Sequence, residues 1–186
     1  MKIGTLFIAT ALLGSLSMAD DQALKKEGVG YIKMLGGTLK SQLQENMKKD
    51  PSGLAAAAFC AGSAESITKE INAKLPKHAS VRRTALKTRN ASNKADAIDE
   101  KVMNEYIKAI EEKSFDPKSP IKLVKDENST RVYKPLLTQG ACLKCHGSTV
   151  SPEITTLVKE QYPQDQAIDF KEGSLRGVIV AEIKNK

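Results

Sequence analysis

Two cysteines and a histidine toward the C-terminus have the spacing of a covalent attachment motif. They are Cys142, Cys145 and His146, in the stretch Cys-Leu-Lys-Cys-His. CxxCH is the pattern of c-type haem attachment, in which each thiol bonds to one vinyl group of a single porphyrin. The histidine then lies beneath the iron as the proximal ligand, and Gly147, which lacks a Cβ, lets the chain turn away close to the ring. The motif predicts one haem c, with its iron, in each chain.

Three other kinds of site also use CxxC pairs. A zinc site needs four ligands and usually a second Cys or His pair, but the remaining candidates, Cys60 and His78, do not cluster with each other. A thioredoxin-like pair begins a helix after a strand, whereas residues 135–140 are predicted to form a loop. A simple disulfide is the third alternative. Haem attachment is favoured because the N-terminus carries an export signal.

The N-terminus has the pattern of a secretory signal peptide. Lys2 is followed by the apolar run 3–16, and Ser17-Met18-Ala19 resembles a small-x-small cleavage site. The run is too short to span a bilayer comfortably, although an uncleaved anchor is an alternative. We expect cleavage of residues 1–19 to leave one domain over 20–186, with no stable membrane insertion. Covalent haem attachment occurs outside the bacterial cytoplasm, so the expected location is the periplasm.

The chain is basic, with a formal net charge of +7 over 186 residues, and loss of Lys2 with the signal lowers this by one. The basic residues are scattered, with no dense run beyond Arg82-Arg83. An exported protein meets little nucleic acid, so we expect no nucleic-acid partner. The charge is typical of a solvated surface that steers the protein toward acidic redox partners. No general acid–base constellation surrounds the motif, and an enzyme is therefore the weaker expectation.

The third cysteine, Cys60, is left unpaired in an oxidising compartment. It could be buried and inert, cross-link a dimer, or bind iron as a thiolate. Small residues surround it in the run Leu54–Ala64, and free cysteine is among the most often buried residue types. The residues alone therefore favour an inert thiol. His78 is predicted to be a solvated loop residue, with a distal iron ligand as the alternative.

Hydrophobic spacing and turn residues predict an α+β domain with an antiparallel sheet, because helices come first and strands follow with hairpin connectivity. Glycines in the first helix are expected to permit close packing or a kink. Asp50 and Pro51 are expected to cap and begin the second helix. The predicted helices cover residues 22–48, 51–74, 95–112 and 151–161, and the predicted strands cover 79–89, 121–125, 130–133 and 177–183.

Four stretches resemble a known family. They are AAAAFCAGSA around Cys60, VRRTALKTRN at 81–90, YKPLLTQGACLKCHG at 133–147 and YPQDQAIDFKEGSLRGVIV at 162–180. They occur in the same order in PAS-like, single-haem c-type domains, which are found as free-standing exported proteins and as modules of bacterial sensors. The resemblance spans most of the chain after the signal. Relatives often have a glycine near the position of Asp169, and this departure touches no proposed ligand.

The resemblance implies a PAS-like antiparallel sheet with N-terminal helices and a covalently bound haem. It also implies that Cys60 is the second axial ligand, opposite His146, which reverses the preference for an inert thiol. The implied function is redox or small-gas sensing, with a separate signalling protein as partner. The alternative is a soluble cytochrome that transfers electrons between periplasmic redox partners.

Two further sets of residues are candidates for contact with the haem. Arg82 or Arg83 could pair with the haem propionates, but one of two neighbours on a strand must face away. Methionine is an alternative to Cys60 as the sixth ligand, although each candidate also fits a core stripe. These methionines are Met34, Met47 and Met103.

Overall fold

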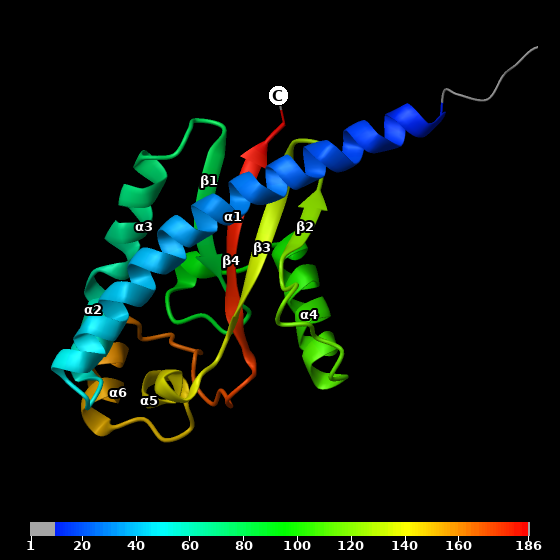
Figure 1. The fold of residues 1–186 in the computed structure, drawn as a ribbon. Helices are drawn as coiled ribbons and strands as arrows, with labels where there is room; N and C mark the ends of the chain where they lie inside the picture. The colour runs from blue at the N-terminus through cyan, green and yellow to red at the C-terminus, as the bar shows by residue number, and fades with distance from the viewer. Residues whose placement is uncertain (1–9, 186) are drawn as a thin grey trace, which may run out of the picture.

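A computed structural model describes residues 10–185, with side chains from residue 20 onward, and Figure 1 shows its fold. In chain order its elements are α1 (Thr10–Lys49), α2 (Leu54–Gly62), α3 (Ala64–Ala73), β1 (Ala79–Thr84), η1 (Ala91–Asn93), α4 (Ala97–Glu111), β2 (Lys122–Lys125), β3 (Ser129–Leu137), η2 (Gly140–Cys142), α5 (Leu143–His146), α6 (Pro152–Gln161) and β4 (Leu175–Lys184). The predicted α+β class is confirmed.

The strands form one antiparallel sheet with the order β1-β4-β3-β2. The β2–β3 hairpin was predicted, and β4 joins the two halves of the sheet because it pairs with β1 on one side and β3 on the other. Between β1 and β2 the chain crosses over through α4. The sheet therefore brings the region around β1 next to the segment that follows β3, which contains the CxxCH motif.

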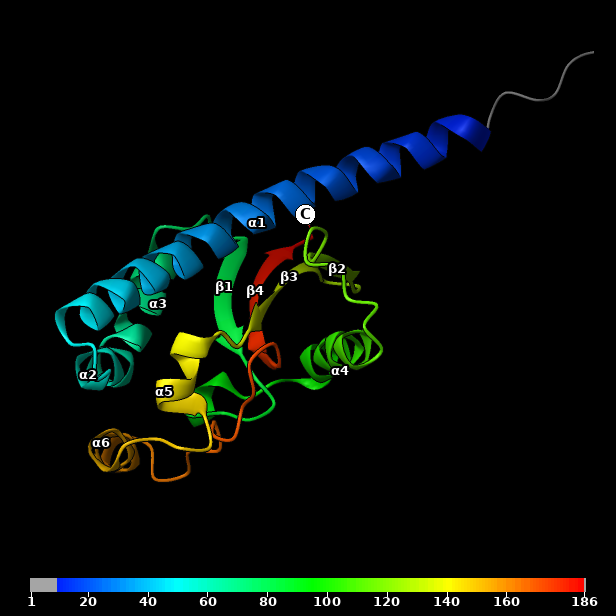
Figure 2. The same ribbon diagram turned by 60° about the horizontal axis from the view of Figure 1, so that its bottom comes forward.

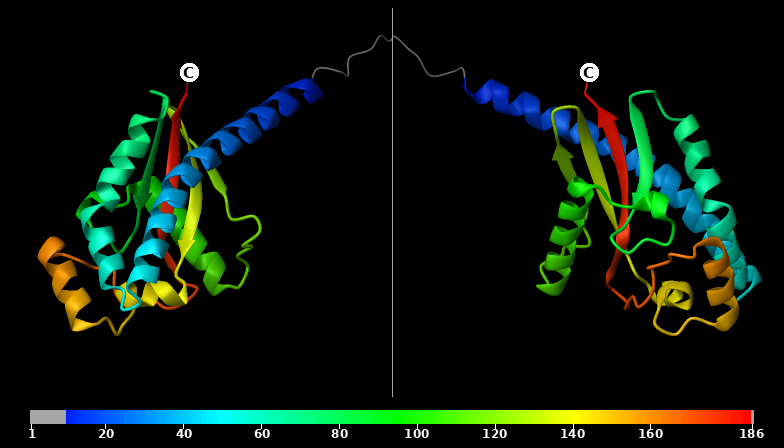
Figure 3. Two further views of the ribbon diagram at one scale, coloured as in Figure 1. Left: turned by 60° about the vertical axis from the view of Figure 1, so that its left-hand side comes forward. Right: turned by 180° about the vertical axis from the view of Figure 1, so that it is seen from behind.

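Helices cover both faces of the sheet (Figures 2 and 3). On one face, Ile32 and Leu35 of α1 and Ile67 of α3 pack against Val81 and Ile179. On the other face α4 packs its own apolar stripe on alternate residues of β3 and β4. This second cluster contains Met103, Tyr106, Tyr133, Val178 and Val180. Because successive side chains of a strand point to opposite faces of the sheet, the core is divided into one cluster on each face.

The first helix is longer than predicted and packs unusually close to the sheet. It begins at Thr10 instead of residue 22, since no proline interrupts the chain before Lys49. A Cβ on Gly28 would lie 2.5 Å from Cγ2 of Val132, so a glycine is needed for this approach. The glycine prediction is confirmed at this position. The N-terminal turns of α1 extend beyond the sheet (Figure 1).

The single helix predicted over 51–74 is wrong, because the chain forms two helices that meet at Ser63. Gly62 and Ser63 are weak helix formers, and the two halves pack in different places. Ala57 of α2 packs against α6, whereas Ile67 of α3 packs against the sheet. Pro51 lies in the turn before α2, but Asp50 still supports the helix start by accepting a 2.9 Å hydrogen bond from the amide of Ala55.

The loop predicted over 135–140 is also partly wrong, since β3 continues to Leu137 and includes Pro135. Proline cannot donate a ladder hydrogen bond and is confined to strand edges. Here β2 pairs only with residues 130–133, so this side of Pro135 lies past the end of β2. Pro135 is opposite Val178 of β4 on its other side. The remaining elements match the predictions to within a few residues, although β1 ends earlier, at Thr84.

The predicted signal peptide, residues 1–19, lies wholly outside the part of the chain with described side chains. Residues 1–9 lie outside the described residues, and residues 10–19 are the first turns of α1. Over residues 10–185, no helix is both long enough and apolar enough to cross a membrane. Export and cleavage after Ala19 therefore stay predictions.

Candidate functional site

The CxxCH motif lies on two short helical turns at one end of the sheet, below β3 in Figure 1. Cys142 ends η2, whereas Cys145 and His146 end α5. All three side chains are half-buried, and the cysteines are free thiols. At Gly147 an added Cβ would lie 2.6 Å from the carbonyl oxygen of Leu143, so glycine is needed for the chain to leave the turn. The close approach of Gly147 to a haem ring stays a prediction.

His146 is held in one tautomer by the backbone. Its Nδ1 lies 2.8 Å from the carbonyl oxygen of Ala167, and because a carbonyl only accepts hydrogen bonds, Nδ1 must carry the proton. Burial, with the positive charges of Arg176 and Arg89, lowers the pKa of His146 to about 3. The ring is therefore neutral near pH 7, and its Nε2 lone pair is available to a metal.

A buried ion pair holds the loop that supports His146. Arg89 pairs with Asp165 at 3.1 Å, and the guanidinium also donates a 2.6 Å hydrogen bond to the carbonyl of Cys145. Asp165 in turn accepts a 2.8 Å hydrogen bond from the amide of Ala167. The pair therefore connects the attachment helix to the residue whose carbonyl orients the histidine. Such partners of a metal-binding histidine fix its orientation and raise its basicity.

Cys60 lies on α2, which packs beside the attachment motif. Cys145 belongs to the same apolar cluster as Ala57 of α2 and Ile154 of α6. Burial raises the pKa of the Cys60 thiol, while nearby Arg83, Arg89 and Arg176 act to lower it. Cys142 and Cys145 are both electrostatic neighbours of Cys60. The structure thus brings the third cysteine to the same site as the motif.

Arg82 and Arg83 face opposite sides of the sheet, as the strand period requires. Arg82 forms a 2.7 Å ion pair with Asp99 of α4. Arg83 instead lies on the side of α3, where it donates a long 3.4 Å hydrogen bond to the carbonyl of Ala64. Arg83 is an electrostatic neighbour of Cys60, so it is the member of the pair that lies at the site.

Other candidates lie elsewhere. His78 is exposed between α3 and β1, at the opposite end of the sheet from α5 (Figure 1), and its Nε2 lies 3.1 Å from Glu27. Met103 is fully buried on the inner side of α4, and Met34 is 39% exposed on α1. Met47 is half-buried near the end of α1. Among the described residues, no group of three or more His, Cys, Asp or Glu side chains could hold a bare metal ion.

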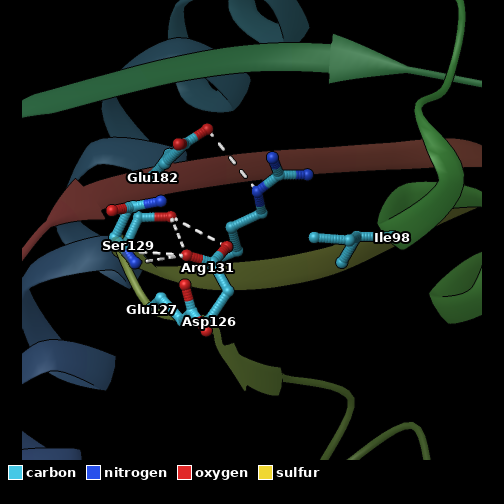
Figure 4. Close-up of a pocket in the computed structure, with 7 residues that line it drawn as sticks. Ile98, Asp126, Glu127, Ser129, Arg131 and Glu182 are labelled. Atoms are coloured by element: carbon cyan, nitrogen blue, oxygen red, sulfur yellow. Dashed lines mark hydrogen bonds and ion pairs between the residues drawn. The ribbon is translucent and has the colours of Figure 1, made fainter.

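A polar cavity of about 350 Å³ lies away from the motif, at the β2–β3 hairpin (Figure 4). Arg131 and Glu182 form its wall, with their side chains 3.5 Å apart. Arg131 also binds Asp96 and Asp99, so its charge is already compensated. No cysteine or histidine lines this cavity, and we assign the chemistry of the protein to the CxxCH end.

Sequence reasoning missed several residues of the site. Arg89, Asp165 and Arg176 are close together in space but distant in the chain, and only the resemblance motifs at 81–90 and 162–180 mark their regions. Phe170 packs edge-on to His146, with ring centroids 6.2 Å apart. Asp169 has φ 61°, a left-handed conformation that glycine adopts without strain and aspartate tolerates.

Comparison with known proteins identifies the family. None of the curated proteins matches this chain. The crystal structure of the cyanobacterial haem protein Tll0287 is similar in fold, with a TM-score of 0.58 and 24% sequence identity over 96% of this chain and 98% of that one. The family model described as Tll0287-like matches residues 17–183. This chain therefore belongs to the Tll0287-like family.

Proposed function

We propose that this protein carries a covalent haem, attached through Cys142 and Cys145, with His146 and Cys60 as the two axial ligands. One observation carries the proposal: α2 brings Cys60 to the attachment motif, where His146 presents a neutral Nε2. Membership of the Tll0287-like family and the similar fold of a cyanobacterial haem protein support it.

The site residues fit a haem group. The nitrogen Nε of Arg83 and that of Arg176 are buried without a hydrogen-bond partner, as expected of cations whose anionic partner is supplied from outside the chain. When bound, a haem supplies one-electron chemistry. The protein's own part is to present a histidine nitrogen, a thiol sulfur and a half-buried, positively charged surface. A thiolate ligand is expected to stabilise ferric iron and lower the reduction potential, opposite to a methionine.

We further propose that the protein senses redox state or a small gas. Cys60 lies on α2, which packs against α6 and contacts α1. Release of the thiolate on reduction would free α2 and change its packing against α1, the helix that extends beyond the sheet (Figure 2). This gives a path from the iron to a surface element, which a sensor requires and an electron carrier does not.

The ligand proposal is tested by changing Cys60 alone. The protein is produced with its signal in a bacterial host that matures c-type cytochromes, and colour that survives acid–acetone extraction shows covalent attachment. Cys60→Ser should keep the haem attached but remove the spectrum of thiolate-ligated, low-spin ferric iron. Ala58→Ser, on the exposed side of the same helix, is the matched control. An unchanged Cys60→Ser spectrum rules out the thiolate ligand.

Sensing and electron transfer predict different responses to reduction. A very low potential with loss of the thiolate ligand and uptake of carbon monoxide supports sensing. A reversible, moderate potential without carbon monoxide binding supports electron transfer instead. Mass spectrometry of the same preparation tests export, because cleavage after Ala19 leaves Asp20 at the N-terminus.

A further inference from the structure

We propose that Arg83 and Arg176 bind the two carboxylate groups of the attached porphyrin. This inference rests on the proposed function, since it assigns residues to the part of the haem that lies away from the thiol bonds. Arg83 lies on β1 and Arg176 lies on the neighbouring strand β4. Arg82 has no part in binding the carboxylates.

Both guanidinium groups lie at the site. The charge of Arg83 interacts with Cys60, Tyr162 and Glu65, and the charge of Arg176 interacts with Arg89, Asp165, Arg83 and Cys142. Arg176 also lies over the ring of Phe170, with its guanidinium carbon 5.2 Å from the ring centre. Phe170 packs against His146. The two arginines thus flank the region bounded by the three cysteines and the proximal histidine.

Neither arginine has a carboxylate partner in the described part of the chain. Each makes one long hydrogen bond to a backbone carbonyl, at 3.4 Å from Arg83 and 3.2 Å from Arg176, and each leaves its Nε buried and unpartnered. Burial, together with the nearby charge of Arg89, lowers the pKa of Arg176 to about 10. The nearest acidic groups already have partners, since Asp165 pairs with Arg89 and Glu65 pairs with Lys69. Buried charges are normally paired, so Arg83 and Arg176 each lack an ion-pair partner of their own among the described residues.

The neighbouring arginines, by contrast, do have acidic partners. Arg89 is paired with Asp165, and Arg82 is paired with Asp99. The charge of a ferric haem with one thiolate ligand balances that of Arg83 and Arg176. Iron, porphyrin ring and thiolate sum to zero, and the two carboxylates are the remaining charge. The guanidinium groups of Arg83 and Arg176 and the two porphyrin carboxylates are therefore equal in number and opposite in charge. Guanidinium and carboxylate groups also form strong, charge-assisted hydrogen bonds with each other.

The experiment uses the holoprotein with ¹³C in the haem carboxylates, introduced from labelled aminolevulinate. Arg83→Gln and Arg176→Gln each remove one charge, Arg176→Lys keeps it, and Lys77→Gln removes an exposed charge at the other end of the sheet as the control. Redox-difference infrared spectra report the labelled carboxylates directly. We expect their bands to shift in both Gln variants, less in the Lys variant, and not in the control.

The reduction potential gives a second readout. Loss of a positive charge near the haem favours ferric iron, so we expect each Gln variant to lower the potential, on the order of tenfold in the ferric-to-ferrous ratio at a fixed potential, or 59 mV for one electron. Unchanged carboxylate bands and potential in both Gln variants would overturn the inference. Protein without covalent haem would instead refute the proposed function.

The wild-type protein provides a measurement that does not depend on the variants folding. Carboxylates paired with arginine stay ionised to lower pH than solvated ones. Labelled wild-type protein should therefore show no isotope-sensitive band of protonated carboxylic acid above about pH 4. Appearance of that band for both carboxylates near neutral pH would also overturn the inference.

Discussion

The ion pair between Arg89 and Asp165 supports a sharp prediction, because it holds the loop beside His146 without contacting the sulfur atoms of the CxxCH motif. Asp165→Asn removes the charge but keeps the side-chain shape, and the remaining oxygen can still accept from the amide of Ala167. Its main effect is to leave Arg89 as a buried cation without its anionic partner. The two side chains are only 11% and 8% exposed, so solvent screens the pair weakly.

Breaking a buried pair by removing one partner costs about 3–5 kcal/mol. Arg89 keeps its hydrogen bond to the carbonyl of Cys145, so we expect the lower end, about 3 kcal/mol. For a chain of this length, the melting temperature should fall by about 6–12 °C. In the haem-loaded protein the reduction potential should also rise, because the loss of a negative charge near the iron disfavours the ferric state.

Thermal unfolding of the holoprotein, followed by circular dichroism, measures the first effect, and a redox titration measures the second. Asp169→Asn is the matched control, because the same chemical change falls on an exposed residue four positions further along the loop. Asparagine also tolerates the left-handed conformation of Asp169. Equal melting temperatures for the two variants would show that the Arg89–Asp165 pair does not stabilise the site.

Two further predictions concern the scaffold. Gly28→Ala should lose about 2 kcal/mol of unfolding free energy in urea, because its Cβ would collide with the short, immobile side chain of Val132; Gly30→Ala, with open space around it, should gain about 0.5–1 kcal/mol from helix propensity. Partial burial acts to raise the pKa of Asp96, but hydrogen bonds from the Asp99 amide and from Arg131 outweigh it and lower that pKa. The stability from Asp96 is therefore present above its unfolded pKa and is lost as pH falls through the lower folded value. Asp96→Asn should lower the melting temperature at pH 7, and this difference from the wild type should shrink as the pH falls below about 4.

Local chemistry explains why the motif and several elements could be predicted. CxxCH is recognised from five consecutive residues, and the covalent haem attachment that it indicates stays a prediction. Ser151 and Pro152 begin α6 as predicted, with Ser151 at the N-cap. The hairpin between β2 and β3 follows from alternation around a polar turn. Each of these signals depends on residues that are neighbours in the chain.

The remaining features depend on contacts between distant residues. The helix break at Ser63 follows from what each half packs against, and Pro135 is tolerated in a strand only because β2 ends early. Arg89 and Asp165 are 76 residues apart, so their pairing follows from topology. Charge and composition alone could not show which arginines already have partners.

Two adjacent arginines of β1, Arg82 and Arg83, differ in whether they have an acidic partner. Arg82 faces α4, where Asp99 is fully buried and also accepts from Arg131 and from the hydroxyl of Tyr133. Arg82, Arg131 and Asp99 are thus paired with one another on that face, so this network can hold α4 to the sheet without a ligand. Arg83, one position later, points to the opposite face and forms no ion pair with a described residue, and its Nε is buried without a hydrogen-bond partner. Because a strand alternates its side chains, the Arg82-Arg83 dipeptide places one charge on each face. The charge of Arg83 lies near the end of the sheet that carries the CxxCH motif.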